Sequence, residues 1–355
     1  MTYCRKCGAK LDEDAKFCRV CGTPVVPVPV TNATRPMAPK RKRHSYLLPV
    51  IILIAVLLTA IIISALLFLP FYPVTFNQTD QAPKASVDDV LVDLQVDVAN
   101  VNISFKNLPN SMVMLNVTAD GNVGILDNPE NAVNVTFNHQ TANNSEVVVA
   151  SVLRGARWPI SFGLNVNCDL YVDPSVNLSL NVRSSVGKIV MNADTKTTLQ
   201  NIDLETTTGS VDVSLSKNVV VANSISLTSI TGTVQFDMNN ADVSGDVSVN
   251  LRSTTGLVNV NLAATQNLSG NVTVNARTTT GSVDLSMEID NNVGGRIESH
   301  TDAGRITVDV QKFSGNQTPL QSNNYPAGNN FLAYVRTTTG GINICAAYGS
   351  SAILS

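Results

Sequence analysis

Apolar and polar residues alternate along the second half of the chain, in units that are each marked by a glycine. Counting from seven of these glycines, the residues two, four and six positions later are apolar in all 21 cases. Alternation with a period of two predicts a β-strand that buries one face. The marking glycines are Gly187, Gly209, Gly232, Gly256, Gly281, Gly304 and Gly340.

A second apolar stripe lies five and seven residues before each glycine, where only Ser299 breaks the pattern. The glycines are 22 to 25 residues apart, except for a last interval of 36. Units of this length bury their apolar stripes only by stacking on one another. We therefore expect a mainly β protein with a right-handed parallel β-helix over residues 163–355, in rungs of about 22–25 residues. Residues 74–162 keep strand character without the register, which predicts first rungs or a cap.

The predicted corner between strands has a recurring sequence, RTTTGSVD at Arg277–Asp284 and ETTTGSVD at Glu205–Asp212. Serine or threonine stands three residues before every one of the seven glycines. A hydroxyl there can bond a backbone group of its own corner or of the neighbouring rung, and glycine supplies the freedom to turn. We expect these threonines to be structural, because no histidine that could act as a base recurs beside them.

The repeated TTG-x-V-x-V units, from about Leu164 to Ala347, resemble the family of β-strand-repeat surface proteins labelled putative adhesins, also called toastrack domains. The resemblance implies an exported, membrane-tethered β-solenoid that serves surface attachment or envelope stress signalling, without catalysis. The composition agrees with such a fold, because aromatic residues make up only 5% of the chain and Asn, Thr, Ser and Val dominate its second half.

An uncharged apolar run, Tyr46–Leu69, precedes the strand units. Roughly 20 apolar residues cross a bilayer core, so residues 46–69 are expected to form one transmembrane helix rather than a cleaved signal peptide. The basic stretch KRKRH at Lys40–His44 lies directly before the run, and positive residues stay on the cytoplasmic side. The expected topology is a single-pass cell-membrane protein with a cytoplasmic N-terminus and an extracytoplasmic C-terminal domain. Residues 23–45, with five prolines, would form an extended basic linker.

Four cysteines near the N-terminus have the spacing Cys4-x2-Cys7 and Cys18-x2-Cys21, and a glycine follows each pair. Two such turns let four thiolates converge on a structural Zn²⁺, and a closed set of four leaves no position for catalysis. A segment this short cannot form a hydrophobic core, and metal binding would therefore supply the free energy that folds it. Residues 1–22 resemble the minimal zinc-ribbon of many prokaryotic membrane proteins, which implies a structural role or the docking of a cytoplasmic protein. Nucleic-acid binding is not expected, because three acidic residues, at 12–14, offset the basic ones.

Arginine recurs on the predicted outer face, four residues before the glycine, in the last units. A stripe of this kind would bind an acidic glycan or lipid. The alternative is that outward-facing carboxylates neutralise it, and the same acids could serve calcium or a polysaccharide-cleaving site, although their offsets predict no cluster. The expected ligand-binding residues are Arg252, Arg277, His300 and Arg336, and the acids are Asp212, Asp237, Asp284 and Asp309.

Three further features concern the exported part. Nine N-x-S/T sequons suit a glycan-carrying surface, although an Asn- and Thr-rich composition also produces such motifs by chance. Cys168 and Cys345 would lie about seven rungs, or roughly 30 Å, apart, so no disulfide is expected between them. Residues Ser314–Asn330 fill the longest interval and are expected to form a loop on one face.

These features predict a non-catalytic membrane protein whose exported β-helix binds or senses envelope material or a protein, while the zinc-ribbon docks a cytoplasmic partner. The alternative is a structural or adhesive surface protein without signalling, and an exported glycan-active enzyme is a more distant one. Signalling requires a partner for the ribbon, whereas adhesion does not. An enzyme requires carboxylates that converge in one groove.

Overall fold

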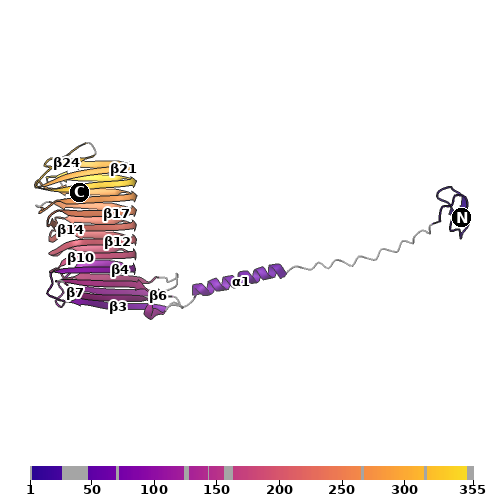
Figure 1. Ribbon diagram of the computed structural model, residues 1–355, viewed down its shortest axis with the longest axis horizontal. Helices are drawn as coiled ribbons and strands as arrows, with labels where there is room; N and C mark the ends of the chain where they lie inside the picture. Colours follow the sequence, from indigo (N-terminus) through magenta and orange to yellow (C-terminus); the bar gives the residue numbers. More distant parts are fainter. Residues whose placement is uncertain are drawn as a thin grey trace. The chain divides into compact units, whose positions relative to one another are not determined.

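The computed structural model describes residues 2–25, 47–68, 72–123, 128–142, 144–155, 163–264, 268–315 and 318–349. The chain divides into two compact units, Met1–Leu67 and Phe68–Ser355 (Figure 1). The first unit contains β1 (Thr2–Tyr3), β2 (Lys10–Leu11) and all but the last residue of α1 (Leu47–Phe68). Most of the linker expected at 23–45 lies outside the described residues.

Helix α1 forms where the apolar run predicts a helix, and it contains no charged residue. Its apolar side chains between Val50 and Ile63 are exposed. Within the described part of the chain, no helix meets the joint requirement of length and hydropathy for a membrane crossing. The transmembrane segment expected at 46–69 is therefore not confirmed.

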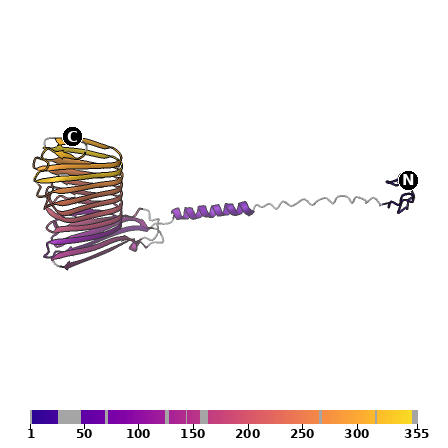
Figure 2. The ribbon, with the colours of Figure 1, turned by 45° about the horizontal axis from the view of Figure 1, so that its top comes forward.

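The strands of the second unit form two large sheets, and within each sheet the strands follow one another along one axis (Figures 1 and 2). The first sheet contains β4 (Asp89–Val98), β7 (Val133–Ala142), β8 (Ser145–Arg154), β10 (Asn177–Val186), β12 (Thr197–Thr208), β14 (Val219–Thr231), β16 (Asp242–Val243), β17 (Val247–Thr255), β19 (Val272–Thr280), β21 (Val293–Ala303), β23 (Phe313–Ser314), β24 (Leu320–Ser322) and β25 (Asn329–Thr339). The second contains β3 (Tyr72–Pro83), β5 (Asn100–Phe105), β6 (Ser111–Val123), β9 (Asn165–Val172), β11 (Ile189–Ala193), β13 (Val211–Leu215), β15 (Val234–Asn239), β18 (Val258–Ala264), β20 (Val283–Ile289), β22 (Ile306–Gln311) and β26 (Ile342–Tyr348). A short 3-10 helix, η1 (Pro129–Asn131), precedes β7.

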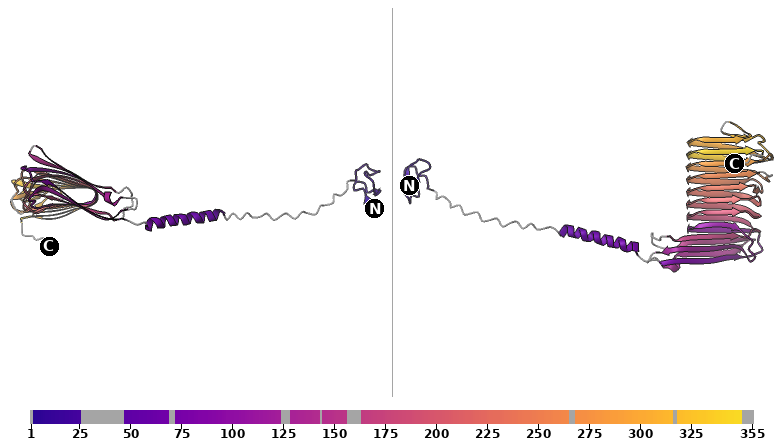
Figure 3. Two further views of the ribbon diagram at one scale, coloured as in Figure 1. Left: turned by 90° about the horizontal axis from the view of Figure 1, so that it is seen from below. Right: turned by 180° about the vertical axis from the view of Figure 1, so that it is seen from behind.

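Each repeat contributes one strand to the first sheet and, after its glycine corner, one strand to the second. Within the repeats, strands pair in parallel with the equivalent strands of neighbouring repeats, as β12 does with β14 and β13 with β15. The views in Figure 3 show these layers from behind and along the stack. The predicted mainly β fold and the parallel stacking of repeats are confirmed, whereas the hand of the coil stays a prediction.

The core lies between the two sheets and consists of the alternating apolar side chains. Leu204 and Leu227 on the first sheet, and Val211 and Val234 on the second, are fully buried. The exception is β22, whose Ile306 and its alternate apolar neighbours are only half-buried, because β22 is the edge strand of its sheet. The two predicted apolar stripes are therefore the core-facing positions, and they weaken only at the end of the stack.

The threonine–glycine corner is held by a hydrogen bond between rungs. In six of the seven repeats, the hydroxyl three residues before the glycine donates to the carbonyl oxygen of the corner glycine in the adjacent rung, which confirms the structural role expected for these residues. The bonds are Thr206 Oγ1 to Gly187 O (3.2 Å), Ser229 Oγ to Gly209 O (2.9 Å), Ser253 Oγ to Gly232 O (2.9 Å), Thr278 Oγ1 to Gly256 O (3.1 Å), Thr337 Oγ1 to Gly281 O (3.1 Å) and Thr301 Oγ1 to Gly340 O (3.2 Å). The seventh, the buried Ser184 Oγ, has no hydrogen-bond partner among the described residues.

The last rungs do not stack in sequence order. Strand β25 lies between β19 and β21, and β26 lies between β20 and β22. A stack in sequence order, which the rung count for Cys168 and Cys345 assumed, would place β21 beside β19, and the structure corrects this assumption. The long interval before Gly340 gives the chain enough length to return and insert the final repeat below the preceding one.

The expected loop at Ser314–Asn330 contains a small hairpin. Strand β23 pairs with β24, and β24 pairs antiparallel with β21 at the edge of the first sheet. The backbone N–H of Ser299 donates to Thr318 Oγ1 at 3.1 Å. The excursion therefore covers the edge that β21 would otherwise leave open.

The segment 74–162 supplies both rungs and an antiparallel end. Strands β4 and β5 pair in parallel with β10 and β11, so they form the rung next to the regular repeats. Beyond them, β3 pairs antiparallel with β6, and β7 pairs antiparallel with β8. Both Cys168 on β9 and Cys345 on β26 are free thiols, as expected from their separation. Burial raises the pKa of the Cys168 thiol to about 12.

Candidate metal centre and outer arginine ladder

Two tight turns at the N-terminus bring the four cysteines together. Strand β1 pairs antiparallel with β2, and the turn between them contains the first cysteine pair. The N–H of Gly8 donates to Cys4 O at 2.8 Å, and the N–H of Gly22 donates to Cys18 O at 2.7 Å. Both glycines have φ of +70°, a left-handed conformation that glycine adopts without steric cost. The sequence thus builds the same turn twice.

The sulfur atoms fit a tetrahedral metal site. The Sγ atoms of Cys4, Cys7, Cys18 and Cys21 all lie within 4.8 Å of one another. The Cys4–Cys21 and Cys7–Cys18 Sγ–Sγ distances are 3.5 and 3.6 Å. A tetrahedral Zn²⁺ bound at 2.3 Å separates its sulfur ligands by about 3.8 Å. The predicted convergence of the four cysteines is confirmed, and the all-sulfur donor set suits zinc.

The surroundings of the sulfurs favour thiolates at some positions and oppose them at others. Backbone hydrogen bonds from Lys6 and Cys7 lower the pKa of Cys4, and hydrogen bonds from Thr23 lower the pKa of Cys21 to about 6. A backbone hydrogen bond from Ala9 lowers the pKa of Cys7, but hydrogen bonds with the neighbouring cysteines and burial outweigh it and raise this pKa to about 12. Four thiolates this close repel one another, so a cation is needed to hold all four deprotonated.

The predicted outer arginines form a ladder across three adjacent strands. Arg252 on β17 is in register with Arg277 on β19, and Arg277 is in register with Arg336 on β25. His300 on β21 follows in the next strand. We call Arg252, Arg277 and Arg336 the arginine ladder. All three side chains are exposed, and the out-of-order insertion of β25 is what makes the ladder continuous.

Two adjoining hollows lie along the ladder and share Arg277 and Arg336. The larger, of about 460 Å³, also exposes amides and hydroxyls of β17, β19 and β25, and the smaller is about 230 Å³. Residues that line the larger hollow include Arg252, Asn250, Asn275, Thr279 and Thr338, and those of the smaller include His300, Tyr334, Thr318 and Glu298. The structure therefore brings all four predicted ligand-binding residues to one surface.

Carboxylates neutralise only one end of this surface. Asp302 Oδ1 lies 2.8 Å from His300 Nε2 and 3.7 Å from a guanidinium nitrogen of Arg336. Among the described residues, Arg252 and Arg277 have no ion pair. These two guanidinium groups are therefore available to a ligand.

The four acids that could have neutralised the ladder lie on the second sheet, and three of them bond other groups. Asp212 pairs with Lys188, Asp237 accepts from Gln235 Nε2 at 2.8 Å, and Asp284 accepts from Asn343 Nδ2 at 2.7 Å. They do not converge either, because Asp212 on β13 and Asp284 on β20 are separated by β15 and β18. The geometry thus favours neither neutralisation nor a paired-carboxylate active site at these residues.

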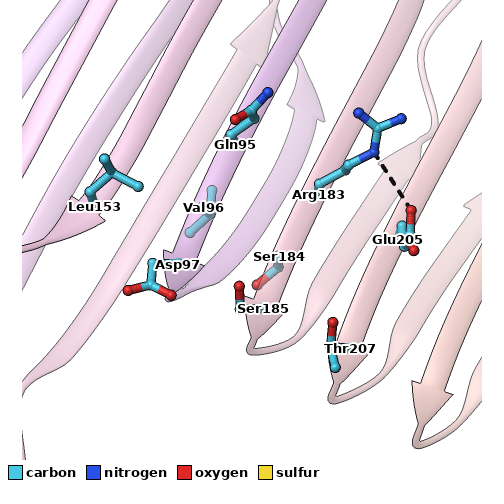
Figure 4. A pocket seen from close by; sticks show the side chains of 9 residues that line it. All are labelled: Gln95, Val96, Asp97, Leu153, Arg183, Ser184, Ser185, Glu205 and Thr207. Carbon is cyan, nitrogen blue, oxygen red and sulfur yellow. Dashed lines mark ion pairs between the residues drawn. The ribbon is translucent and has the colours of Figure 1, made fainter.

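A further hollow, of about 380 Å³, lies around Arg183 and Glu205, which form an ion pair at 3.6 Å (Figure 4). Figure 4 shows Asp97 and Leu153 contributing from β4 and β8. The sequence pattern did not identify these two residues because the corner between β4 and β5 has Ala99 where the later repeats have the glycine that sets the register. The alternation within β4 was the one available signal.

Comparisons with known proteins support the N-terminal domain directly. Residues 3–25 match the family model of the zinc-ribbon domain. No match was found among curated proteins.

Solved structures similar to the chain include a putative cell adhesion protein from Clostridium sporogenes, with 11% identity and a TM-score of 0.43, covering 77% of this chain and 99% of that one. A putative adhesin from Bacteroides fragilis has 12% identity and a TM-score of 0.33, covering 76% and 96%. One from Parabacteroides merdae has 10% identity and a TM-score of 0.26, covering 76% and 95%. With TM-scores this low, the similarity supports no conclusion about function.

Proposed function

We propose that this chain is a non-catalytic surface protein whose stacked repeats, coiled as a right-handed parallel β-helix, bind anionic envelope material. The observation that carries the proposal is the arginine ladder. Like charges on adjacent strands repel, so three aligned arginines cost stability unless an anion lies between them. Arg252 and Arg277 have no carboxylate partner among the described residues, and the hollow beside them is open to solvent.

The same proposal includes a membrane anchor and a cytoplasmic zinc-ribbon. The uncharged sequence 46–69 and the basic stretch before it support a single span with the N-terminus inside. The sulfur geometry supports Zn²⁺ bound by the four cysteines. Tyr3, Phe17 and Val20 are 57%, 62% and 76% exposed in this small domain, which favours a role in docking a cytoplasmic protein.

Anion binding is tested by retention on carboxymethyl-cellulose beads, using the full-length chain in a neutral detergent. We expect Arg252→Gln/Arg277→Gln to elute at a clearly lower salt concentration than the wild type, because surface charge pairs are screened by salt. The matched control is Arg183→Gln/Lys188→Gln, which removes the same charge from side chains that already pair with Glu205 and Asp212, away from the ladder. The basic N-terminal region is common to all three proteins. Equal elution of the two double variants would refute an anion site at the ladder.

The second candidate is an adhesive surface protein without signalling, in which the zinc-ribbon has no partner. The two are separated by a cross-linked pull-down of the full-length protein from its native membrane, beside Cys4→Ser/Cys7→Ser. We expect cytoplasmic proteins to be captured by the wild type and lost with the variant. If the wild type and the variant capture the same proteins, and all of these are envelope proteins, the docking role is refuted and the adhesive function is favoured.

A further inference from the structure

We propose that the arginine ladder recognises a short stretch of a carboxylated polysaccharide, which lies across the strands along the stacking axis. This inference rests on the proposed anion-binding function and adds the class of ligand. It follows from the spacing of the charges, from the neutral groups beside them and from the acidic residues that end the ladder.

The spacing of the charges follows from the strand register. Arg252, Arg277 and Arg336 occupy directly paired positions of adjacent parallel strands, so their backbones are about 4.8 Å apart. Each guanidinium presents a planar fork that binds one carboxylate with two hydrogen bonds. A polymer with one carboxylate on each successive sugar unit, extended across the strands, presents its charges with a comparable repeat.

Neutral hydrogen-bonding groups lie on both sides of the ladder. Two residues before the arginines are Asn250 and Asn275, which form their own ladder, with Asn275 Nδ2 donating to Asn250 Oδ1 at 3.1 Å. Two residues after them are threonines, of which Thr279 and Thr338 line the same hollow. Amides and hydroxyls of this kind match the hydroxyl groups of a sugar ring. A phosphate polymer without sugar hydroxyls would leave them unused.

The ladder ends after three rungs. Below Arg252 the equivalent positions are Thr228 and then Glu205, and above Arg336 the position is His300, which pairs with Asp302. The chain as a whole has a net charge of −3, although its N-terminal region is basic. A long polyanion such as a nucleic acid would meet repulsion beyond the ladder, whereas about three sugar units fit between these ends.

The test is direct binding of trigalacturonate to the full-length chain in neutral detergent, measured by titration calorimetry. Its methyl ester and inorganic tripolyphosphate serve as competing probes. We expect the acid form to bind and the ester to bind at least about tenfold more weakly, since each charged hydrogen-bonded pair is worth roughly one decade in Kd. Tripolyphosphate keeps the charges but has no hydroxyls for the amides and threonines of the hollow, so it should also bind at least about tenfold more weakly.

Three variants locate the binding. Arg277→Gln is expected to weaken trigalacturonate binding about tenfold, and Arg277→Lys to recover part of the loss, because lysine keeps the charge but not the planar fork. Arg183→Gln, off the ladder, is expected to leave the Kd unchanged. None of these exposed substitutions should lower the unfolding temperature, and Arg277→Gln should raise it slightly because it removes the repulsion within the ladder.

The outcomes distinguish the inference from the function beneath it. If tripolyphosphate binds as tightly as trigalacturonate and Arg277→Gln weakens both, the site takes anions but the carboxylated-polysaccharide inference is overturned. Tight binding of the neutral ester would overturn it as well. If no anionic probe binds, or if Arg277→Gln changes nothing, the proposed anion-binding function fails together with the inference.

Discussion

Replacing Cys18 by serine is expected to unfold the segment Thr2–Val25 and to abolish its zinc binding. The only buried side chains in this segment are those of Cys4, Leu11 and Cys18, so apolar burial alone cannot maintain the fold. Structural zinc contributes roughly 10–16 kcal/mol to domains of this kind, and loss of one ligand removes most of it. The measurement is metal content per chain, together with the thiolate-to-metal absorption of the cobalt-substituted full-length protein.

Cys345→Ser is the matched control for this prediction. Cys345 is a half-buried free thiol on β26 in the other unit, so its replacement should leave the metal content and the cobalt spectrum unchanged. If Cys18→Ser retains one zinc per chain with an unchanged cobalt spectrum, the four sulfurs are not the ligand set.

The metal centre could be predicted from the sequence because all of its determinants are local. The two cysteine pairs and the glycine after each pair fix two turns. The short segment of sequence between the pairs then limits how the two turns can be placed, so the four sulfur atoms come together. The backbone hydrogen bonds of Gly8 and Gly22 are those that such turns require. Only the effect of Thr23 on Cys21 needed the coordinates.

The strand repeats could be predicted for the same reason, but the order of the last rungs could not. Alternation identifies which face of a strand is buried, and the corner hydroxyl identifies where the strand turns. Neither pattern tells which rung lies beside which, because equivalent positions of any two repeats pair in the same register. Arg277 pairs with Arg336, and it would have paired with His300 in the same way if β21 had been its neighbour. The identity of the neighbour depends on contacts between residues far apart in the sequence, such as those of β24 with β21.

The arginine ladder was predictable as a set of outward positions, and its electrostatic surroundings were not. Parity along the strand placed Asp212 and Asp284 outward, which is where they lie. However, the alternation along one strand does not tell how the outward side chains of one sheet lie relative to those of the other. These acids lie on the outer face of the second sheet, away from the strands of the first sheet that carry the arginines. The three-dimensional arrangement, rather than the count of charges, leaves Arg252 and Arg277 available.

Replacing Gly281 by alanine is expected to destabilise the second unit by about 2–6 kcal/mol. Gly281 has φ of +140°, and a Cβ there would lie 2.0 Å from the carbonyl oxygen of Gly256 in the adjacent rung. That oxygen accepts the bond from Thr278, so the corner cannot move away without breaking the ladder of hydroxyl bonds. The estimate combines backbone strain of about 1–3 kcal/mol with a comparable cost of overpacking.

The measurement is thermal unfolding of the full-length chain, in which a loss of this size lowers the Tm on the order of 10 °C. Gly328→Ala is the control, because no atom lies within 4 Å of its Cβ position and its backbone is outside the left-handed region. Its Tm should stay within about 2 °C of the wild type. An equally small change for Gly281→Ala would mean that the rungs can separate at the corner, and that the recurring glycines are not what sets their distance. A large fall for Gly281→Ala alone would establish the corner as the point where each rung is locked to the next.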